Sequence, residues 1–234
     1  MMHKKTIAYF FDLLSNEHMV KRAITKEPKA ILHKQAKEVP LKDISSTHIR
    51  QIIQDMSDTL RASKDGIGIA APQIGVPLRI FVASEEALAI AIKNDATSPD
   101  KITPGNFIPL TKGGSINISP PDKGDERGFS KELLKWHHFV FINPKILKTS
   151  RKKLDDSEGC LSVPGVFGIV PRAEKVKVAA YDERGKKFER GASGIFARLL
   201  QHEIDHLDGH LFLEKAREIH RVEKKKDISQ FKTN

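Results

Sequence analysis

"RLLQHEIDHLDGHLF", residues 198 to 212, contains the pattern His-Glu-x-x-His and predicts the helix around which the fold forms. On a helix, His202 and His206 lie one turn apart on the same face, with Glu203 beside them. Two imidazole nitrogens then suit one metal ion, and the carboxylate lies near the water that such an ion activates. A tetrahedral catalytic site needs a third protein ligand, which must come from elsewhere in the chain.

Downstream of this pattern no residue makes a convincing third ligand. Zinc peptidases with the longer pattern His-Glu-x-x-His-x-x-Gly-x-x-His take it from the final histidine. Gly209 is in the right place here, but Phe212 occupies the final position. His210 comes two residues early and is expected to point elsewhere. The glutamates that follow belong to a charged segment and are expected to be solvated. They are Glu214, Glu218 and Glu223.

The only cysteine of the chain offers a better ligand. Cys160 lies in "DDSEGCLSVPGVFG", residues 155 to 168, in a Gly-Cys turn ahead of Pro164. Taken alone, a single cysteine is most often a small buried hydrophobic residue. A thiolate is an excellent ligand, however, and together with two histidines it leaves the fourth position open for water. We therefore predict a metal site at Cys160, His202 and His206. A closed structural zinc site would need a fourth soft ligand, and none offers itself.

Periodic patterns predict the elements that surround this site. From Thr47 onward apolar residues recur at helical spacing, with Ser46 or Thr47 as the N-cap. The core face of that helix is Ile49, Ile52, Ile53, Met56 and Leu60. The helix that carries the histidines has a core face of its own. It consists of Ile195, Phe196, Leu199 and Leu200. A further short helix is expected near residues 213 to 224.

The remaining patterns predict strands and a loop. "RIFVAS" (79–84) and "HHFVFINPKIL" (137–147) have strand character, and residues 174 to 192 alternate around a turn, as a hairpin does. Residues 64 to 78 are punctuated by glycine and proline and are expected to form a loop. The order of helix, strands, hairpin and helix predicts an α+β fold, with mixed or antiparallel sheets packed around the central His-Glu-x-x-His helix.

Length and composition indicate one globular domain over residues 1 to 234, and the predicted catalytic metal site makes it a metallohydrolase domain. Residues 85 to 137 are dense in Pro, Gly, Ser and Asp, and we expect them to be an insertion outside the core. No run approaches the ~20 apolar residues that span a bilayer, so no membrane contact is expected. Asp12 interrupts the apolar N-terminal patch, which is therefore not expected to be a signal peptide. One cysteine permits no internal disulfide, so a reducing, cytoplasmic location is expected.

The formal net charge of +10 has two explanations, solubility and an anionic partner such as RNA. Lysine density is greatest in residues 214 to 234, which we expect to form a basic tail able to contact ribosomes. The oligomeric state leaves no signal in the sequence.

Three motifs resemble, in the same order, those of the peptide deformylases. They are "GIGIAAPQIG" (66–75), "EGCLSVPG" (158–165) and "QHEIDHLDG" (201–209). The family's patterns are Gly-x-Gly-x-Ala-Ala-x-Gln, Glu-Gly-Cys-Leu-Ser and Gln-His-Glu-x-Asp-His. The resemblance covers roughly residues 20 to 84 and 138 to 213. Each motif alone is weak, whereas all three in order are specific.

The resemblance implies removal of the N-formyl group from formyl-methionine of nascent polypeptides, with release of formate. It implies the same three metal ligands, Cys160, His202 and His206. The family's metal is usually ferrous iron, which zinc, nickel or cobalt can replace. One cysteine and two histidines suit several divalent ions, so the sequence does not choose among them.

The resemblance also implies the catalytic roles. Glu203 takes a proton from the attacking water and later returns it to the leaving amine. The Gln73 side-chain amide and the backbone N–H of Leu161 donate to the negative charge that develops on the formyl oxygen.

Substrate contacts are expected from the first and second motifs. Gly68, with no side chain, lets a peptide backbone approach closely enough to pair as an added strand. Ile67 and residues 166 to 168, together with His202, are candidates for the methionine pocket. Glu158 is expected to order the site through hydrogen bonds. Asp205 either holds a ligand histidine or is a solvated carboxylate of the helix.

The sequence departs from the family's pattern in two places and is compatible with two other functions. Phe167 stands where many members carry a polar or basic residue, and the segment 85 to 137 is far longer than the family's usual connection. A metallopeptidase could use the same helix, although Phe212 speaks against it. A non-catalytic binding protein on this fold would have no reason to keep Gln73, Leu161 and Glu203 together.

Overall fold

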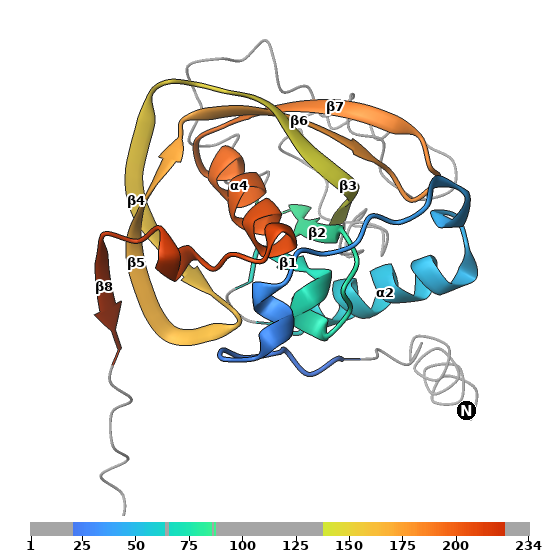
Figure 1. Ribbon diagram of the computed structural model, residues 1–234, viewed down its shortest axis with the longest axis horizontal. Coiled ribbons are helices and arrows are strands. Elements are labelled where there is room, and N and C mark those ends of the chain that lie inside the picture. The colour runs from blue at the N-terminus through green and yellow to red at the C-terminus, as the bar shows by residue number, and fades with distance from the viewer. Residues whose placement is uncertain (1–20, 64–65, 86, 88–137, 223–234) are drawn as a thin grey trace, which may run out of the picture.

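Two antiparallel sheets and two long helices make up the described part of the chain (Figure 1). The structure is a computed structural model that describes residues 21 to 63, 66 to 85, 87 and 138 to 222. One sheet has the strand order β1-β2-β3-β6-β7 and the other has the order β4-β5-β8. Helix α4 (Gly194–Asp208), which carries the His-Glu-x-x-His pattern, lies between the two sheets (Figure 1). The expected α+β class is confirmed.

The larger sheet is antiparallel throughout. Its strands are β1 (Gly68–Ala70), β2 (Ile80–Ser84), β3 (His138–Thr149), β6 (Lys175–Tyr181) and β7 (Lys187–Ser193). Strands β6 and β7 form the expected hairpin. The Asp182 carboxylate accepts hydrogen bonds from the N–H groups of Arg184 and Lys186, and Gly185 has a φ of 77°.

Helices α2 (Thr47–Arg61) and α4 cover opposite faces of this sheet. Because successive side chains of a strand point to opposite faces, β2 contributes to both sides. Phe81 and Ala83 belong to the core beneath α4, whereas Ile80 and Val82 belong to the core beneath α2. A strand covered on both faces must be apolar at every position, which explains the continuous run in β2.

Helix α2 begins where its sequence signal predicts. The Ser46 side chain accepts a hydrogen bond from the backbone N–H of Ile49, so Ser46 and not Thr47 is the N-cap. The apolar face expected from the spacing is buried against β1 and β2.

The smaller sheet corrects one prediction. It consists of β4 (Lys153–Cys160), β5 (Val163–Ala173) and β8 (Glu218–Arg221), all antiparallel. The expected helix near 213 to 224 is wrong. A 3-10 turn, η6 (Phe212–Glu214), leads instead into β8, which pairs with Val166–Ile169 of β5. All four residues of β8 are exposed, so the segment has no apolar stripe that a helix could bury, and backbone pairing fixes it.

The segment expected as a loop between α2 and β2 is also more regular than predicted. It contains the short strand β1 and the 3-10 helix η3 (Ala71–Ile74), which ends at Gly75 with a φ of 80°. Two shorter 3-10 turns, η1 (Ala30–His33) and η2 (Leu41–Asp43), precede α2. The pairing of β1 with β2 places the first glycine motif beside α4.

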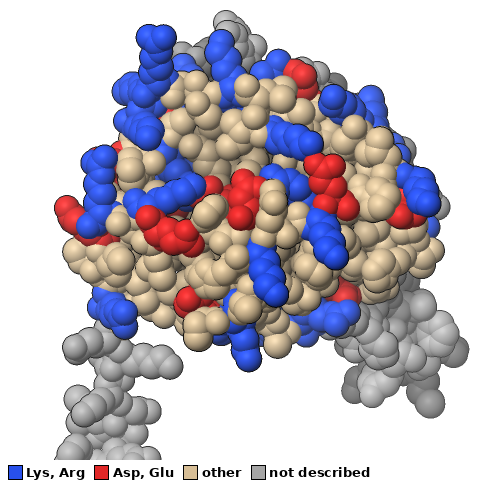
Figure 2. Space-filling view, in the orientation of Figure 1, with Lys and Arg blue, Asp and Glu red and all other residues tan. Residues whose placement is uncertain are grey.

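The expected insertion lies almost wholly outside the described residues, as do residues 223 to 234 of the expected basic tail. Residues 214 to 222 of that tail belong to the fold as η6 and β8. Within the described ranges no helix is long and apolar enough to cross a bilayer. Figure 2 shows Lys and Arg side chains spread over the whole of one face, with acidic side chains between them.

Candidate active site

Helix α4 presents the two histidines together. It follows β7 directly and ends at Gly209, whose φ of 82° suits the left-handed C-cap. One helical turn separates His202 and His206, and their ring centroids are 4.9 Å apart. Their positions follow from the 3.6-residue period that the sequence motif predicts.

Strand β4 delivers the third candidate ligand. Cys160 is its last residue, and the two-residue turn at Leu161 and Ser162 leads back into β5. The cysteine sulfur lies 3.2 Å from His206 Nε2. The Sγ atom of Cys160 and one ring nitrogen from each of His202 and His206 all lie within 4.8 Å of one another. The three residues predicted as ligands are therefore adjacent in space.

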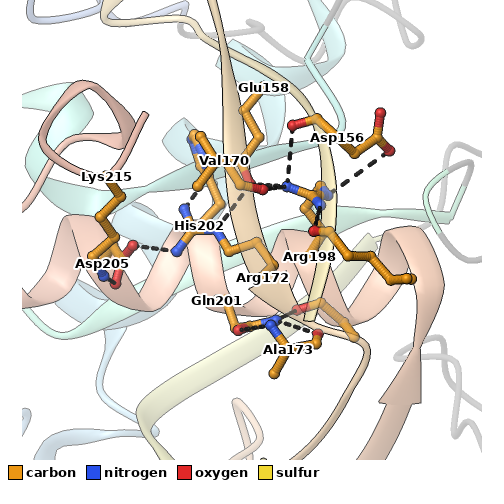
Figure 3. Close-up of polar contacts among 12 residues, drawn as sticks. Asp156, Glu158, Val170, Arg172, Ala173, Arg198, Gln201, His202, Asp205 and Lys215 are labelled. Atoms are coloured by element: carbon orange, nitrogen blue, oxygen red, sulfur yellow. Dashed lines mark hydrogen bonds and ion pairs between the residues drawn. The ribbon is translucent and has the colours of Figure 1, made fainter. Parts of the chain in front are cut away.

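Glu158 orients one of these histidines (Figure 3). Its Oε2 lies 2.9 Å from His202 Nδ1, which leaves the Nε2 atom of that ring to face the cysteine. Arg172 pairs with both oxygens of Glu158, and Arg198 donates to Oε1 at 2.7 Å. A carboxylate that binds the outer nitrogen of a histidine fixes the tautomer and orientation of a metal ligand. Glu158 also lines the cavity, but its hydrogen-bonding capacity is used within the protein.

Asp205 does not hold a ligand histidine, so that expectation is wrong. Its carboxylate pairs with Arg172 and with Lys215 Nζ, as Figure 3 shows. Asp205 lies on the side of α4 that faces β5, which carries Arg172. Glu158, on β4, binds the ring of His202, which agrees with its expected role of ordering the site through hydrogen bonds.

Charge within the cluster changes two pKa values. Burial raises the pKa of the Cys160 thiol, but the neighbouring His206 and His202 outweigh burial and hold it well below its usual range. Burial lowers the pKa of His202, but its bonds to Cys160 and Glu158 raise it overall, to about 10. A thiolate, the form that binds metals, is thus favoured before any cation enters.

Glu203 has a buried carboxylate that can still accept a hydrogen bond. Burial raises its pKa to about 7, despite the opposing effect of His202 and His206. Its Oε2 atom is buried and has no hydrogen-bond partner among the residues that the structure describes. A buried unsatisfied oxygen beside two histidines and a thiolate is suited to accept a proton from a bound water.

Gln73 reaches the site from η3. Its side-chain oxygen accepts a hydrogen bond from the Ala70 N–H, which directs the amide nitrogen inward. That nitrogen lies 3.5 Å from Cys160 Sγ and 3.2 Å from Ser162 Oγ. The Gln73 amide and the Leu161 main chain are therefore both adjacent to the candidate metal site.

A cavity of about 410 Å³ opens onto this cluster. It is lined by most of the predicted site residues, but His206, which is buried, does not line it, and neither do Gly168, predicted for the methionine pocket, and Asp205. Gly68 is needed there, because a Cβ atom at this position would lie 2.6 Å from Glu203 Oε1. Phe167, 43% exposed, is part of the lining, and its ring lies against Gly159.

The residues fit a divalent cation. One sulfur and two imidazole nitrogens are a donor set for such ions, and three protein ligands leave a position for water or substrate. The unsatisfied Oε2 atom of Glu203, the residue next to His202, is available to accept a proton from a water bound there. The contact between Glu158 and His202 Nδ1 is of the kind that orients the ring of a metal-binding histidine.

Two arginines that support the site were not identified from the sequence. Arg198 lies four residues before His202 on the same helix, and that spacing was the available signal. Arg172 lies within the range that resembles the family, but none of the three motifs contains it. Lys26 also lines the cavity, and no pattern in the sequence marks it as a site residue.

The chain is similar to known proteins over most of its length. The family model described as Polypeptide deformylase matches residues 21–222. "Peptide deformylase 1A, chloroplastic" of Solanum lycopersicum is 34% identical over 209 residues, or 88% of this chain; the match spans 64% of that protein's length. A peptide deformylase of Chloroflexus aggregans is 32% identical over 194 residues, covering 82% of this chain and 84% of that protein.

A solved structure is similar as well. It is the crystal structure of class I type b peptide deformylase from Acinetobacter baumannii with Met-Ala-Ser bound. The TM-score is 0.60 at 29% sequence identity, and the match covers 84% of this chain and 99% of that chain.

Proposed function

The chain belongs to the peptide deformylase family, a family of metal-dependent hydrolases, and from that membership we propose that it removes the N-formyl group from formyl-methionine of nascent polypeptides. The products are formate and a free α-amine. The observation that carries the proposal is the convergence of Cys160, His202, His206 and Glu203 beside one cavity.

Cys160, His202 and His206 would hold the metal. A divalent cation bound there supplies a Lewis acid that lowers the pKa of water and polarises the formyl oxygen. By family resemblance the resident ion is ferrous iron, with zinc, nickel or cobalt as replacements. Glu158 keeps the His202 ring in the orientation that ligation needs.

The chain's own residues then move the proton and stabilise charge. Glu203 accepts a proton from the attacking water, because its buried carboxylate has a pKa of about 7 and an unsatisfied oxygen. The Gln73 amide and the Leu161 N–H donate to the formyl oxygen as negative charge develops. Glu203 finally returns the proton to the departing amine.

Substrate recognition is proposed for the walls of the cavity. Gly68 leaves room for a peptide backbone beside Glu203, and Ile67 offers apolar surface to a methionine side chain. The Acinetobacter baumannii enzyme binds Met-Ala-Ser, a peptide of the kind that deformylation would yield. Phe167 gives the rim an apolar character that suits apolar residues beyond the methionine.

Formate release from a formyl-Met peptide tests this proposal. Protein purified without oxygen and loaded with ferrous iron is expected to release formate, and a chelator is expected to abolish the release. Oxygen is excluded because oxidation of the Cys160 thiolate would eject the metal. Absence of turnover by protein that holds one metal ion per chain would contradict the proposal.

Glu203→Gln tests the assigned acid–base role. The amide keeps the size of the side chain but cannot accept the proton, so kcat is expected to fall about 10²–10⁴-fold. Metal content is expected to stay the same, since Glu203 is not a ligand. The matched control is Glu218→Gln, an exposed position in β8, with unchanged turnover. Undiminished activity of Glu203→Gln would rule out the mechanism.

Cleavage of an unformylated peptide separates this function from a metallopeptidase. Phe212 is buried where the third histidine of such enzymes would be, and His210 instead pairs with Glu214 at the surface. We therefore expect formate release without peptide-bond cleavage.

Ribosome contact through residues 223 to 234 and a cytoplasmic location stay predictions. The tomato relative carries the name chloroplastic, so location needs its own test in cells. Truncation after Val222 keeps β8 intact and is expected to weaken salt-sensitive binding to ribosomes. Equal ribosome binding by the truncated and full chains would show that residues 223 to 234 are not needed for the contact.

A further inference from the structure

Residues 22 to 27, here called the N-terminal strap, join the two loops that carry the proposed oxyanion donors. The backbone N–H of Thr25 donates to the Gln73 carbonyl at 2.7 Å. Two residues later, the N–H of Glu27 donates to the Ser162 carbonyl at 3.0 Å. The strap therefore runs from η3 to the turn between β4 and β5 and fixes the distance between them.

Both ends of the strap are anchored. At one end Arg22 pairs with Asp55 at 2.7 Å, and that carboxylate is 2% exposed on α2. At the other end the Glu27 side chain lies 2.8 Å from His33 Nε2. The residue between the two backbone bonds, Lys26, is consequently held against the site.

The Lys26 ammonium donates to the Leu161 carbonyl at 2.5 Å. This carbonyl belongs to the peptide group that joins Leu161 to Ser162. The nitrogen of the same peptide group, Ser162 N, lies 3.4 Å from Cys160 Sγ. An ammonium, a peptide group and a thiolate are thus connected in series. A cation at the oxygen of a peptide group polarises it and strengthens its N–H as a donor.

We propose that Lys26 is a positioning residue of the active site, acting through the Leu161–Ser162 peptide group on the Cys160 sulfur. It also holds the main chain of Leu161, whose own N–H is the proposed oxyanion donor. Hydrogen bonds to a ligand sulfur change its electron donation and so tune the metal. This inference rests on the proposed function and adds a residue that touches neither the metal nor the reacting atoms.

A direct contact between Lys26 and the substrate is the competing explanation, since Lys26 also lines the cavity. The two roles change different quantities. Loss of a substrate contact raises KM with kcat unchanged, whereas loss of a positioning contact lowers kcat. Only the positioning role reaches the sulfur, so only that role changes a spectroscopic signal of the thiolate.

The test uses the full chain loaded with Co²⁺, whose thiolate complex gives a sulfur-to-metal charge-transfer band. In Lys26→Met the band is expected at longer wavelength, because a less polarised N–H stabilises the sulfur electrons less. The kcat for a formyl-Met peptide is expected to fall roughly three- to tenfold, less than for a direct partner of a ligand, with KM changed less than twofold. Lys26→Arg keeps a cationic donor and is expected to restore both quantities.

Lys29→Met is the matched control. Lys29 is an exposed lysine three residues further along, and within the described residues its side chain has no hydrogen bond or ion pair. The charge-transfer band, kcat and KM of Lys29→Met are expected to equal those of the wild type. Thermal unfolding midpoints are compared for all variants, and Lys26→Gln replaces Lys26→Met if the latter does not fold.

Three outcomes would overturn the inference. They are an unmoved band in Lys26→Met, a rise in KM alone, and an arginine variant no better than the methionine one. Failure of the proposed function is a different result: the wild type itself would then release no formate although it holds the metal. A wild type with formate release and a thiolate band, and an unaffected Lys26→Met, would refute the role of Lys26 alone.

Discussion

Single atoms decide what fits beside Glu203. A Cβ at residue 68 would lie 2.6 Å from Glu203 Oε1 and 2.7 Å from Leu199 Cδ1, so one of these groups must move. We expect Gly68→Ala to lower kcat/KM about a hundredfold, because a displacement near 1 Å misaligns a catalytic group. Metal content, measured by elemental analysis, is expected to stay at the wild-type level.

Gly191→Ala provides the comparison for this substitution. A Cβ at Gly191, on β7, meets nothing within 4 Å. Its activity is expected to equal that of the wild type. Equal activity of both alanine variants would show that close backbone approach at Gly68 is unimportant.

At the scale of elements, the start of α2 depends on one hydroxyl. Ser46→Ala removes the acceptor for the Ile49 N–H and is expected to lower the free energy of unfolding by about 1 kcal/mol. Thr47→Ala removes a hydroxyl from the first helical residue, which is exposed, and is expected to change stability by less than about 0.5 kcal/mol. Urea unfolding of both variants distinguishes the two caps that the sequence allowed. Equal losses would mean that Ser46 is not the functional cap.

The connection between α4 and the smaller sheet depends on a buried arginine. Arg198 donates to Glu158 and to the carbonyls of Leu154 and Val170, so it ties the helix of the histidines to the hairpin of Cys160. Arg198→Met removes the donor to these three acceptors. The free energy of unfolding is expected to fall by about 1–3 kcal/mol. Metal affinity, measured by competition with a chelator, is expected to fall as well.

Arg217→Met is the matched change on the surface of the same sheet. Its partner Asp155 lies 3.4 Å away, and the two side chains are 66% and 52% exposed. An exposed pair of this kind is expected to contribute at most about 1 kcal/mol. If Arg198→Met proved as mild as Arg217→Met, the buried network would not hold the two elements together.

For the whole molecule, the metal is expected to stabilise the fold, because its candidate ligands come from elements far apart in the chain. An ion present at a hundred times its Kd adds about 2.7 kcal/mol to the free energy of unfolding. For a domain of this size that corresponds to about 5–10 °C in Tm. Chelation should therefore lower Tm in the wild type and leave Tm of Cys160→Ala unchanged. A wild-type Tm independent of metal would contradict the predicted metal site.

The sequence by itself determined the features that depend on local spacing. Helical periodicity puts His202 and His206 on one face, and a lone cysteine with two histidines predicts the donor set that the structure brings within 4.8 Å. The cap and apolar stripe of α2 and the β6–β7 hairpin follow from patterns a few residues long. Such signals are readable because the interacting groups are close in the chain.

Only the tertiary structure decided the features that depend on distant segments. Glu158 is separated from Arg198 by 40 residues, and Lys26 from Leu161 by 135, so no local pattern relates them. The exchange of a predicted helix for β8 has the same origin. Residues 218 to 221 bury no face of their own, and the free backbone groups of β5 determined their conformation. Long-range contacts are chosen by packing of the whole chain, which spacing in a sequence does not encode.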